Sequence, residues 1–276
     1  MMPMNAQFQL LEDGLGAGAP PAGWAAIVDL PVLVLVGVTG VGKSTAVNAL
    51  RSGWDGVSLL PNRRKIADLL VIPTVQGWDG ETPGAVTDRR LRFDYTRRYR
   101  ERYSGGLAHA LSRLVLPRPQ AGAPGLQIFD GLRGADEVTF AAQSLPLARF
   151  AVLHAPDVVR VERLLQRRDA FDQVAGLEAG GGFRWEDAAE GRALFTQEEQ
   201  DRLAALVRRG EVGGVELAAK VAIVAAERRN YDPHAAAEIL RREAPDRTVV
   251  VDTTTHSPAE AAAAIGELIH AAAGSQ

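Results

Sequence analysis

The feature that most constrains this chain is the string GVTGVGKS at positions 37–44. It places Gly37, Gly42, Lys43 and Ser44 at the spacing G-x-x-x-x-G-K-S. Glycines at this spacing let the backbone curl until successive N–H groups face one anion, and a helix that follows directs its unpaired N–H groups at the same anion. The string therefore predicts a nucleotide-binding loop that consists of Gly37, Val38, Thr39, Gly40, Val41, Gly42, Lys43, Ser44 and Thr45.

The segments on either side of the loop fit this prediction. Residues 30–36, LPVLVLV, form an apolar run of the kind that is buried on both faces of a parallel sheet, and a helical pattern covers 43–50. In this strand–loop–helix context Lys43 is expected to reach the β- and γ-phosphates, and the Ser44 hydroxyl to bind Mg²⁺. Only three lysines occur in the chain, and one of them falls at the required position.

The rest of the chain alternates between strand and helix patterns. Further buried strands are predicted at 69–74, 126–130, 148–154 and 248–252, with helices at 96–115, 135–144, 157–169 and 258–272. This alternation predicts an α/β fold, namely a three-layer doubly wound P-loop fold with a mostly parallel five-stranded sheet. We expect a flexible lead-in over 1–23 and one domain over 24–276. Its helical insertions are expected at about 75–125 on the acceptor side and about 167–246 on the lid side.

Composition narrows the class of protein further. With 276 residues, 46% of them hydrophobic, the chain is long enough to bury a large core. The absence of cysteine excludes disulfides and thiolate chemistry. The first thirty residues contain no Lys or Arg and no long apolar run, so we expect a cytoplasmic protein without a membrane partner. A formal net charge of −3 argues against a general nucleic-acid coat protein.

A second predicted metal ligand is Asp130, which ends the apolar segment 126–130. A carboxylate at the end of a strand beside the phosphate loop is placed to bind Mg²⁺, directly or through water. The alternative is that Asp130 is a turn residue or a helix-capping residue. Arg133 follows closely and is a candidate ligand for the phosphates or for the acceptor.

Segment 87–103 contains seven arginines and three of the four tyrosines. Like charges this close repel each other unless an anion offsets them. We therefore predict that Arg89, Arg97 and Arg98 bind a substrate phosphate, while a nucleic-acid backbone bound along 89–102 is the alternative.

Asp88 precedes this arginine-rich helix and is the candidate base or orienting group. The tyrosines at 95, 99 and 103 form one helical stripe, which is equally suited to packing against the core.

The order of these motifs resembles the nucleotide and nucleoside kinase branch of P-loop proteins, which includes nucleoside monophosphate kinases, deoxynucleoside kinases and zeta-toxin-like enzymes. The motifs that carry the resemblance are the loop, LQIFDG, VVRVERLLQRRD and TVVVDTTTHSPAE. The resemblance implies that lid arginines Arg163, Arg167 and Arg168 close over the phosphates. It further implies an ATP- and Mg²⁺-dependent transfer of the γ-phosphoryl group to a nucleoside or nucleoside monophosphate.

Two other classes of P-loop protein match the sequence less well. A signalling GTPase would carry a guanine-specifying N-K-x-D string, which the sequence lacks. Ser104-Gly105-Gly106 lies upstream of Asp130, as the signature loop of an ABC-type ATPase would, but Asp130 is followed by Gly131 and not by a catalytic Glu. A break after the arginine-rich helix is the other interpretation of these glycines. An ATPase coupled to a nucleic-acid or protein partner remains the alternative function, and no oligomeric state is predicted.

Overall fold

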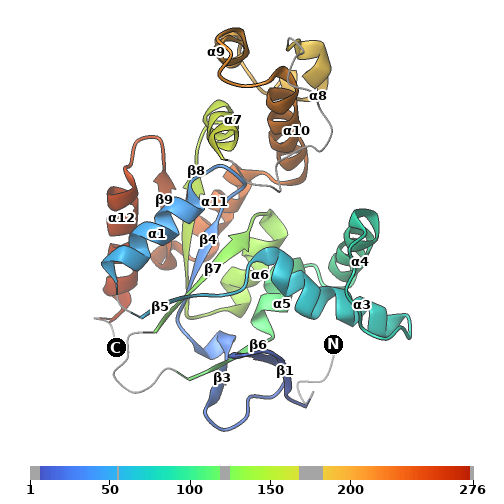
Figure 1. The fold of residues 1–276 in the computed structure, drawn as a ribbon. Coiled ribbons are helices and arrows are strands. Elements are labelled where there is room, and N and C mark those ends of the chain that lie inside the picture. Colours follow the sequence, from blue (N-terminus) through green and yellow to red (C-terminus); the bar gives the residue numbers. More distant parts are fainter. Residues whose placement is uncertain (1–6, 55, 119–124, 168–182, 274–276) are drawn as a thin grey trace.

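The computed structural model describes residues 7–54, 56–118, 125–167 and 183–273. Its centre is a parallel sheet in which the loop-bearing strand occupies the middle position (Figure 1). The strands in spatial order are β5 (Val57–Leu59), β7 (Leu126–Leu132), β4 (Val32–Val36), β8 (Ala148–His154) and β9 (Thr248–Asp252). The predicted α/β fold with a five-stranded parallel sheet is confirmed.

The middle strand β4 is apolar at every position because both of its faces are covered. Val32, Val34 and Val36 face one core, which includes residues of α5, α6 and α11. Leu33 and Leu35 face the other core, together with residues of α1 and α12. The helices are α1 (Lys43–Gly53) and α12 (Pro258–Ala273) on this second face, and α5 (Gly106–Ser112), α6 (Ala135–Ser144) and α11 (Pro233–Glu243) on the first. Helix, sheet and helix thus make the three layers.

A small antiparallel sheet lies below the first core, and part of it corrects a prediction. It contains β1 (Gln9–Glu12), β2 (Leu15–Ala17), β6 (Leu114–Pro117) and β3 (Trp24–Ala26) in that order. Residues 9–17 belong to the lead-in 1–23 that was expected to be flexible. Instead Gly14, at φ 70°, makes the turn between two strands, and Leu15 is buried. Gly16 leaves room for the ring of Phe8, which a Cβ atom would meet at 2.3 Å.

The prediction of a strand at 69–74 is wrong. These residues lie in a π-helical turn (Ala67–Val71) and in α3 (Ile72–Trp78), which follow α2 (Arg63–Ile66). A short apolar run fits a buried helix as well as a strand, and Pro73 fits the first turn of α3. The fifth strand is instead β5, an edge strand whose sequence, VSL, includes a polar residue because the strand is partly exposed.

The helix predicted at 96–115 also has different limits. Helix α4 (Arg89–Arg102) ends before Gly105, α5 begins at Gly106, and the chain then enters β6. The break predicted at the two glycines is confirmed, and Gly106 has a φ of 51°. Tyr95 and Tyr99 are buried, so the tyrosine stripe packs on the core.

Helix α7 (Asp157–Gln166) and part of the segment predicted as an insertion at about 167–246 build a helical lobe with its own core. Its other helices are α8 (Ala189–Arg192), α9 (Gln197–Arg208) and α10 (Gly214–Asn230). Val161, Leu217 and Val221 are fully buried among them. Helix α11 belongs to the sheet layer, because it packs on α6 and β8. No helix in the described part of the chain is long and apolar enough to cross a membrane.

Candidate active site

The predicted nucleotide-binding loop connects β4 to α1 at the carboxyl edge of the sheet, where ligands bind in folds of this class. Gly37, Gly40 and Gly42 all have φ values between 86° and 151°. A Cβ on Gly37 would lie 2.6 Å from the carbonyl oxygen of Leu153, and one on Gly40 would lie 3.1 Å from that of Arg160. The glycine pattern is therefore required both by the loop's backbone conformation and by close neighbours.

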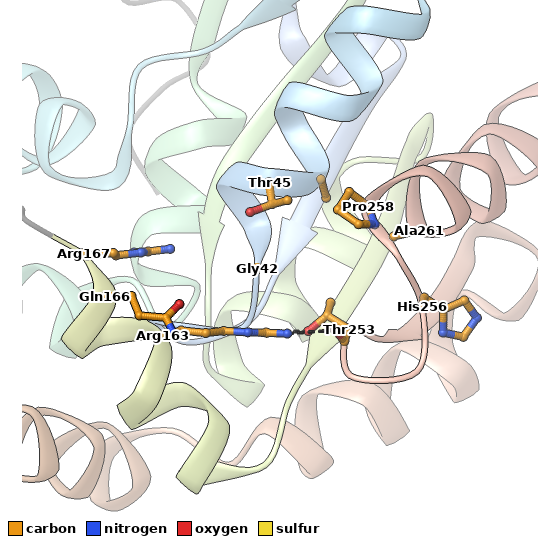
Figure 2. A pocket seen from close by; sticks show the side chains of 10 residues that line it. Gly42, Thr45, Arg163, Gln166, Arg167, Thr253, His256, Pro258 and Ala261 are labelled. Carbon is orange, nitrogen blue, oxygen red and sulfur yellow. Dashed lines mark hydrogen bonds between the residues drawn. The ribbon is translucent and has the colours of Figure 1, made fainter. Parts of the chain in front are cut away.

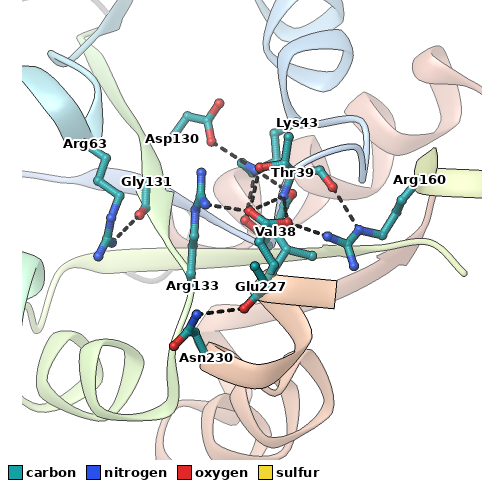
Figure 3. A network of polar contacts seen from close by, with 12 residues as sticks. Val38, Thr39, Lys43, Arg63, Asp130, Gly131, Arg133, Arg160, Glu227 and Asn230 are labelled. Atoms are coloured by element: carbon teal, nitrogen blue, oxygen red, sulfur yellow. Dashed lines mark hydrogen bonds and ion pairs between the residues drawn. The ribbon is translucent and has the colours of Figure 1, made fainter. Parts of the chain in front are cut away.

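Lys43 lies inside the loop, with its side chain 11% exposed. Its Nζ donates to the carbonyl oxygens of Gly37 and Val38, at 2.9 Å each, and lies 3.7 Å from Oδ1 of Asp130 (Figure 3). Burial lowers the pKa of Lys43 to about 8, with a smaller decrease from Arg133 and an opposing increase from Asp130. The ammonium group thus lies in a poorly solvated place, where an added phosphate would raise its pKa.

This lowered pKa predicts a pH dependence of nucleotide binding. Bound phosphate favours the protonated lysine, while the free protein loses that proton as the pH rises through about 8. The association constant for ADP should therefore be flat from pH 7 to 8 and then fall by up to about tenfold per pH unit. Calorimetry in two buffers of different ionisation enthalpy should detect proton uptake at pH 9. Lys43→Arg should flatten the profile, and an unchanged slope in that variant would contradict this assignment.

Asp130 fits the predicted role of a metal ligand. It lies near the end of β7, in register with Leu35 of β4 beside the loop. Its Oδ1 is buried and has no hydrogen-bond partner among the described residues, which suits an atom that binds a cation. Ser44 is exposed in the first turn of α1. These two oxygens are hard ligands of the kind that Mg²⁺ prefers, and the ion would neutralise phosphate charge there.

The sequence analysis missed Glu227, which comes from the last turn of α10. Its carboxylate accepts hydrogen bonds from the N–H of Thr39, at 3.0 Å, and from the Thr39 hydroxyl, at 2.6 Å (Figure 3). Arg133 donates to it at 2.6 Å, and Arg160 donates to it as well. Arg160 is only 1% exposed and also bonds the carbonyl oxygen of Thr39 and the carboxylate of Asp157. A lone glutamate inside a helical pattern gave no signal of this role.

Arg133, predicted as a candidate ligand for the phosphates or for the acceptor, makes protein contacts that the sequence did not indicate. Its Nη1 pairs with Glu227, and its backbone N–H donates to Glu137 at 3.3 Å. Its Nε is buried and has no hydrogen-bond partner among the described residues. One donor of this guanidinium is therefore still available close to Lys43 and Asp130.

A cavity of about 370 Å³ opens beside the start of α1, as Figure 2 shows. Two of the three predicted lid arginines, Arg163 and Arg167, line it. Arg163 donates to the hydroxyl and carbonyl oxygens of Thr253, at 2.8 Å each, so it joins α7 to the loop after β9. Arg168 lies outside the described residues. The other lining residues are Gly42, Thr45, Ala46, Gln166, His256, Pro258 and Ala261.

Two of the three predicted phosphate-binding arginines of α4 are paired with carboxylates. Arg98 forms two hydrogen bonds with Asp79, and Arg97 pairs with Asp94 and Glu101. Acidic residues thus offset the charge of these two arginines without an external anion. Arg89 begins the helix and is exposed.

The structure assigns Asp88 a different place from the one expected of a base. Its Oδ1 accepts from the N–H of Leu91 at 2.7 Å, so it is the N-cap of α4. Figure 1 shows α4 beside α3 at one edge of the molecule, away from α1. The structure therefore does not bring Asp88 to the phosphate loop.

A second cavity, of about 420 Å³, lies where α4 meets the end of α10 and the start of α6. It is lined by Arg97, Arg100, Glu101, Ser104, Gly134, Ala135, Asp136, Glu137, Asn230, Tyr231 and Asp232. Two chain segments that line it, 134–137 and 230–232, directly continue the segments that carry Arg133 and Glu227. Glu137, which lines the cavity, accepts a hydrogen bond from the backbone N–H of Arg133, so the cavity borders Arg133.

The sequence matches no protein-family model and no curated protein. Among solved structures, a sulfotransferase from Alicyclobacillus acidocaldarius is similar, with 12% sequence identity and a TM-score of 0.35. That match covers 82% of this chain and 74% of the sulfotransferase.

Proposed function

We propose that this protein is an ATP- and Mg²⁺-dependent phosphotransferase that moves the γ-phosphoryl group to a small hydroxyl-bearing acceptor. The observation that carries the proposal is the cluster of Lys43, Asp130 and Arg133 at one end of a glycine loop. Phosphoryl transfer needs positive charge and precise positioning at that place more than it needs covalent chemistry. Asp130 and Ser44 would hold Mg²⁺, which neutralises charge between the β- and γ-phosphates.

The two cavities support one orientation of the nucleotide. The base and sugar would occupy the cavity beside Gly42 and Thr45, between Arg163 and the loop after β9. The phosphates would then run along the loop past Lys43, so that the terminal group lies toward Thr39. In this orientation Arg163 and Arg167 contact the nucleoside end of the donor, and Arg133 contacts the transferred group.

The acceptor is proposed to occupy the second cavity, beyond Arg133. Its lining contains four carboxylates, Glu101, Asp136, Glu137 and Asp232, and two guanidiniums, Arg97 and Arg100. Arg97 pairs with Glu101, and Arg63 pairs with Glu137, which leaves two carboxylates, Asp136 and Asp232, against Arg100. An excess of carboxylates repels a phosphate and accepts hydrogen bonds from hydroxyl groups. An uncharged nucleoside or sugar is therefore favoured over a nucleoside monophosphate as the acceptor.

The ion pairs of α4 weaken the alternative of an ATPase coupled to nucleic acid. A basic helix binds a nucleic-acid backbone through charges that are free to replace counterions. Three of the seven arginines of α4, Arg92, Arg97 and Arg98, are instead paired with Asp68, Asp94, Glu101 and Asp79, so these three charges are not free for that role.

The test of the proposal is to follow the label from γ-labelled ATP in the presence of Mg²⁺ and paired acceptors. Each pair consists of a nucleoside or sugar and its own monophosphate. We expect label on the uncharged member of at least one pair, little free phosphate, and loss of transfer when Mg²⁺ is chelated. Label found only as inorganic phosphate, and accelerated by nucleic acid, would overturn the proposal in favour of the ATPase. Transfer only to monophosphates would overturn the assignment of the acceptor.

A further inference from the structure

The carboxylate of Glu227 is held by donors from three separate parts of the chain. Thr39 of the loop donates its N–H at 3.0 Å and its hydroxyl at 2.6 Å. Arg133, which follows β7, donates at 2.6 Å, and Arg160 of α7 donates to the other oxygen. This is the point at which the lid helix α10 reaches the phosphate loop, as Figure 3 shows.

These donors match a phosphoryl group better than they match a carboxylate. Two guanidiniums, one loop N–H and one hydroxyl converge on a single small anion. A carboxylate offers one negative charge and two oxygens, whereas a terminal phosphoryl group offers up to two charges and three oxygens. The unpartnered, buried Nε of Arg133 is one donor that the carboxylate leaves unused.

The position of the donors along the loop points to the terminal phosphate. Nζ of Lys43 bonds the carbonyl oxygens of Gly37 and Val38, so the ammonium lies next to Thr39. The lysine of such a loop contacts the β- and γ-phosphates. The cavity for the nucleoside lies at the other end of the loop, beside Gly42 and Thr45.

We infer that Thr39, Arg133 and Arg160 form the binding site of a nucleoside triphosphate's terminal phosphoryl group, which Glu227 occupies until the nucleotide displaces it. The inference rests on the proposed function, because it needs a nucleotide in the loop. It follows that a triphosphate must displace Glu227 and that a diphosphate need not. Glu227 thus lowers the affinity for ATP relative to ADP, and its displacement releases the end of α10 from the loop.

The test compares Mg-ATP with Mg-ADP by calorimetry, using the natural protein, Glu227→Gln and the control Glu216→Gln. Glu216 lies on the same helix, in its first turn, so this control makes the same chemical change away from the loop. The neutral amide that Glu227→Gln introduces competes more weakly than a carboxylate for charged donors. The ratio of ATP affinity to ADP affinity should therefore rise about tenfold in Glu227→Gln and stay unchanged in Glu216→Gln.

Two outcomes separate the failure of this inference from failure of the proposed function. Binding of both nucleotides with an unchanged ratio in Glu227→Gln would overturn the inference alone. Absence of nucleotide binding in every variant would overturn the proposed function and the inference with it. As a second measurement, inorganic tripolyphosphate should raise the Tm of Glu227→Ala more than that of the natural protein. An equal rise in the two proteins would count against the terminal phosphate site.

Discussion

Replacing Lys43 with alanine is expected to lower phosphoryl transfer by about three orders of magnitude while the fold is retained. The lysine would contact the β- and γ-phosphates, and removal of one preorganised charge beside a developing negative charge costs about 10²–10³ in rate or more. The side chain lies inside the loop and has only the carbonyl oxygens of Gly37 and Val38 as hydrogen-bond partners among the described residues, with Asp130 as its ion-pair partner. Single-turnover measurement with saturating ATP would report the chemical step.

The matched control for this prediction is Lys65→Ala. Lys65 is 49% exposed and pairs with Glu12 in the N-terminal hairpin, away from the loop. The Lys65→Ala variant should keep the turnover and the Tm of the natural protein. Turnover of Lys43→Ala at the natural rate would contradict the whole assignment of the loop. A large fall in the Tm of Lys43→Ala would show instead that the residue is needed for folding.

Replacing Arg160 with methionine is expected to reduce the free energy of unfolding by about 3 kcal/mol or more. Arg160 is 1% exposed and joins three elements, through Thr39 of the loop, Asp157 of α7 and Glu227 of α10. Without the charge of Arg160, the carboxylates of Asp157 and Glu227 stay in a poorly solvated place and have one guanidinium fewer as a partner. Breaking a buried ion pair in this way is costly because the remaining charge stays buried.

Urea denaturation at pH 7 would measure this change, with Arg202→Met as the control. Arg202 also pairs with a carboxylate, that of Glu162, but it is 56% exposed. Because exposed pairs contribute little, the control should lose less than about 1 kcal/mol. Equal losses in the two variants would mean that the contacts of Arg160 with the loop add no stability.

The sequence predicted the sheet and the loop because these depend on local patterns. An apolar strand followed by GVTGVGKS has few alternative structures, and Asp130 follows from its place at the end of a strand. The edge strand β5 was missed because it has only three residues and its side chains are partly exposed, so it forms no apolar run. The run 69–74 was predicted as a strand but is helical. Buried helices and buried strands both have short apolar runs, so the sequence alone does not distinguish them.

The parts of the site that depend on distant contacts could not be predicted. Glu227 meets Thr39 across 188 positions in the chain, and no local pattern marks such a pair. The arginines of α4 were expected to need a phosphate because their acidic partners, such as Asp68 and Asp79, lie 24 and 19 positions away. Asp88 was interpreted as a base where a simpler local role, the N-cap of the following helix, was already sufficient.

The small antiparallel sheet has a consequence for synthesis of the chain on the ribosome. Strands β2 and β3 both pair with β6, which comes roughly 100 residues later in the sequence. At about 5–20 residues per second, these two early strands leave the ribosome several seconds before their partner exists. During that interval their unpaired edges and the apolar side chains of Leu15 and Ile27 are exposed to other nascent chains. The segment that carries β2 and β3 therefore completes its fold late, although it is made well before β6.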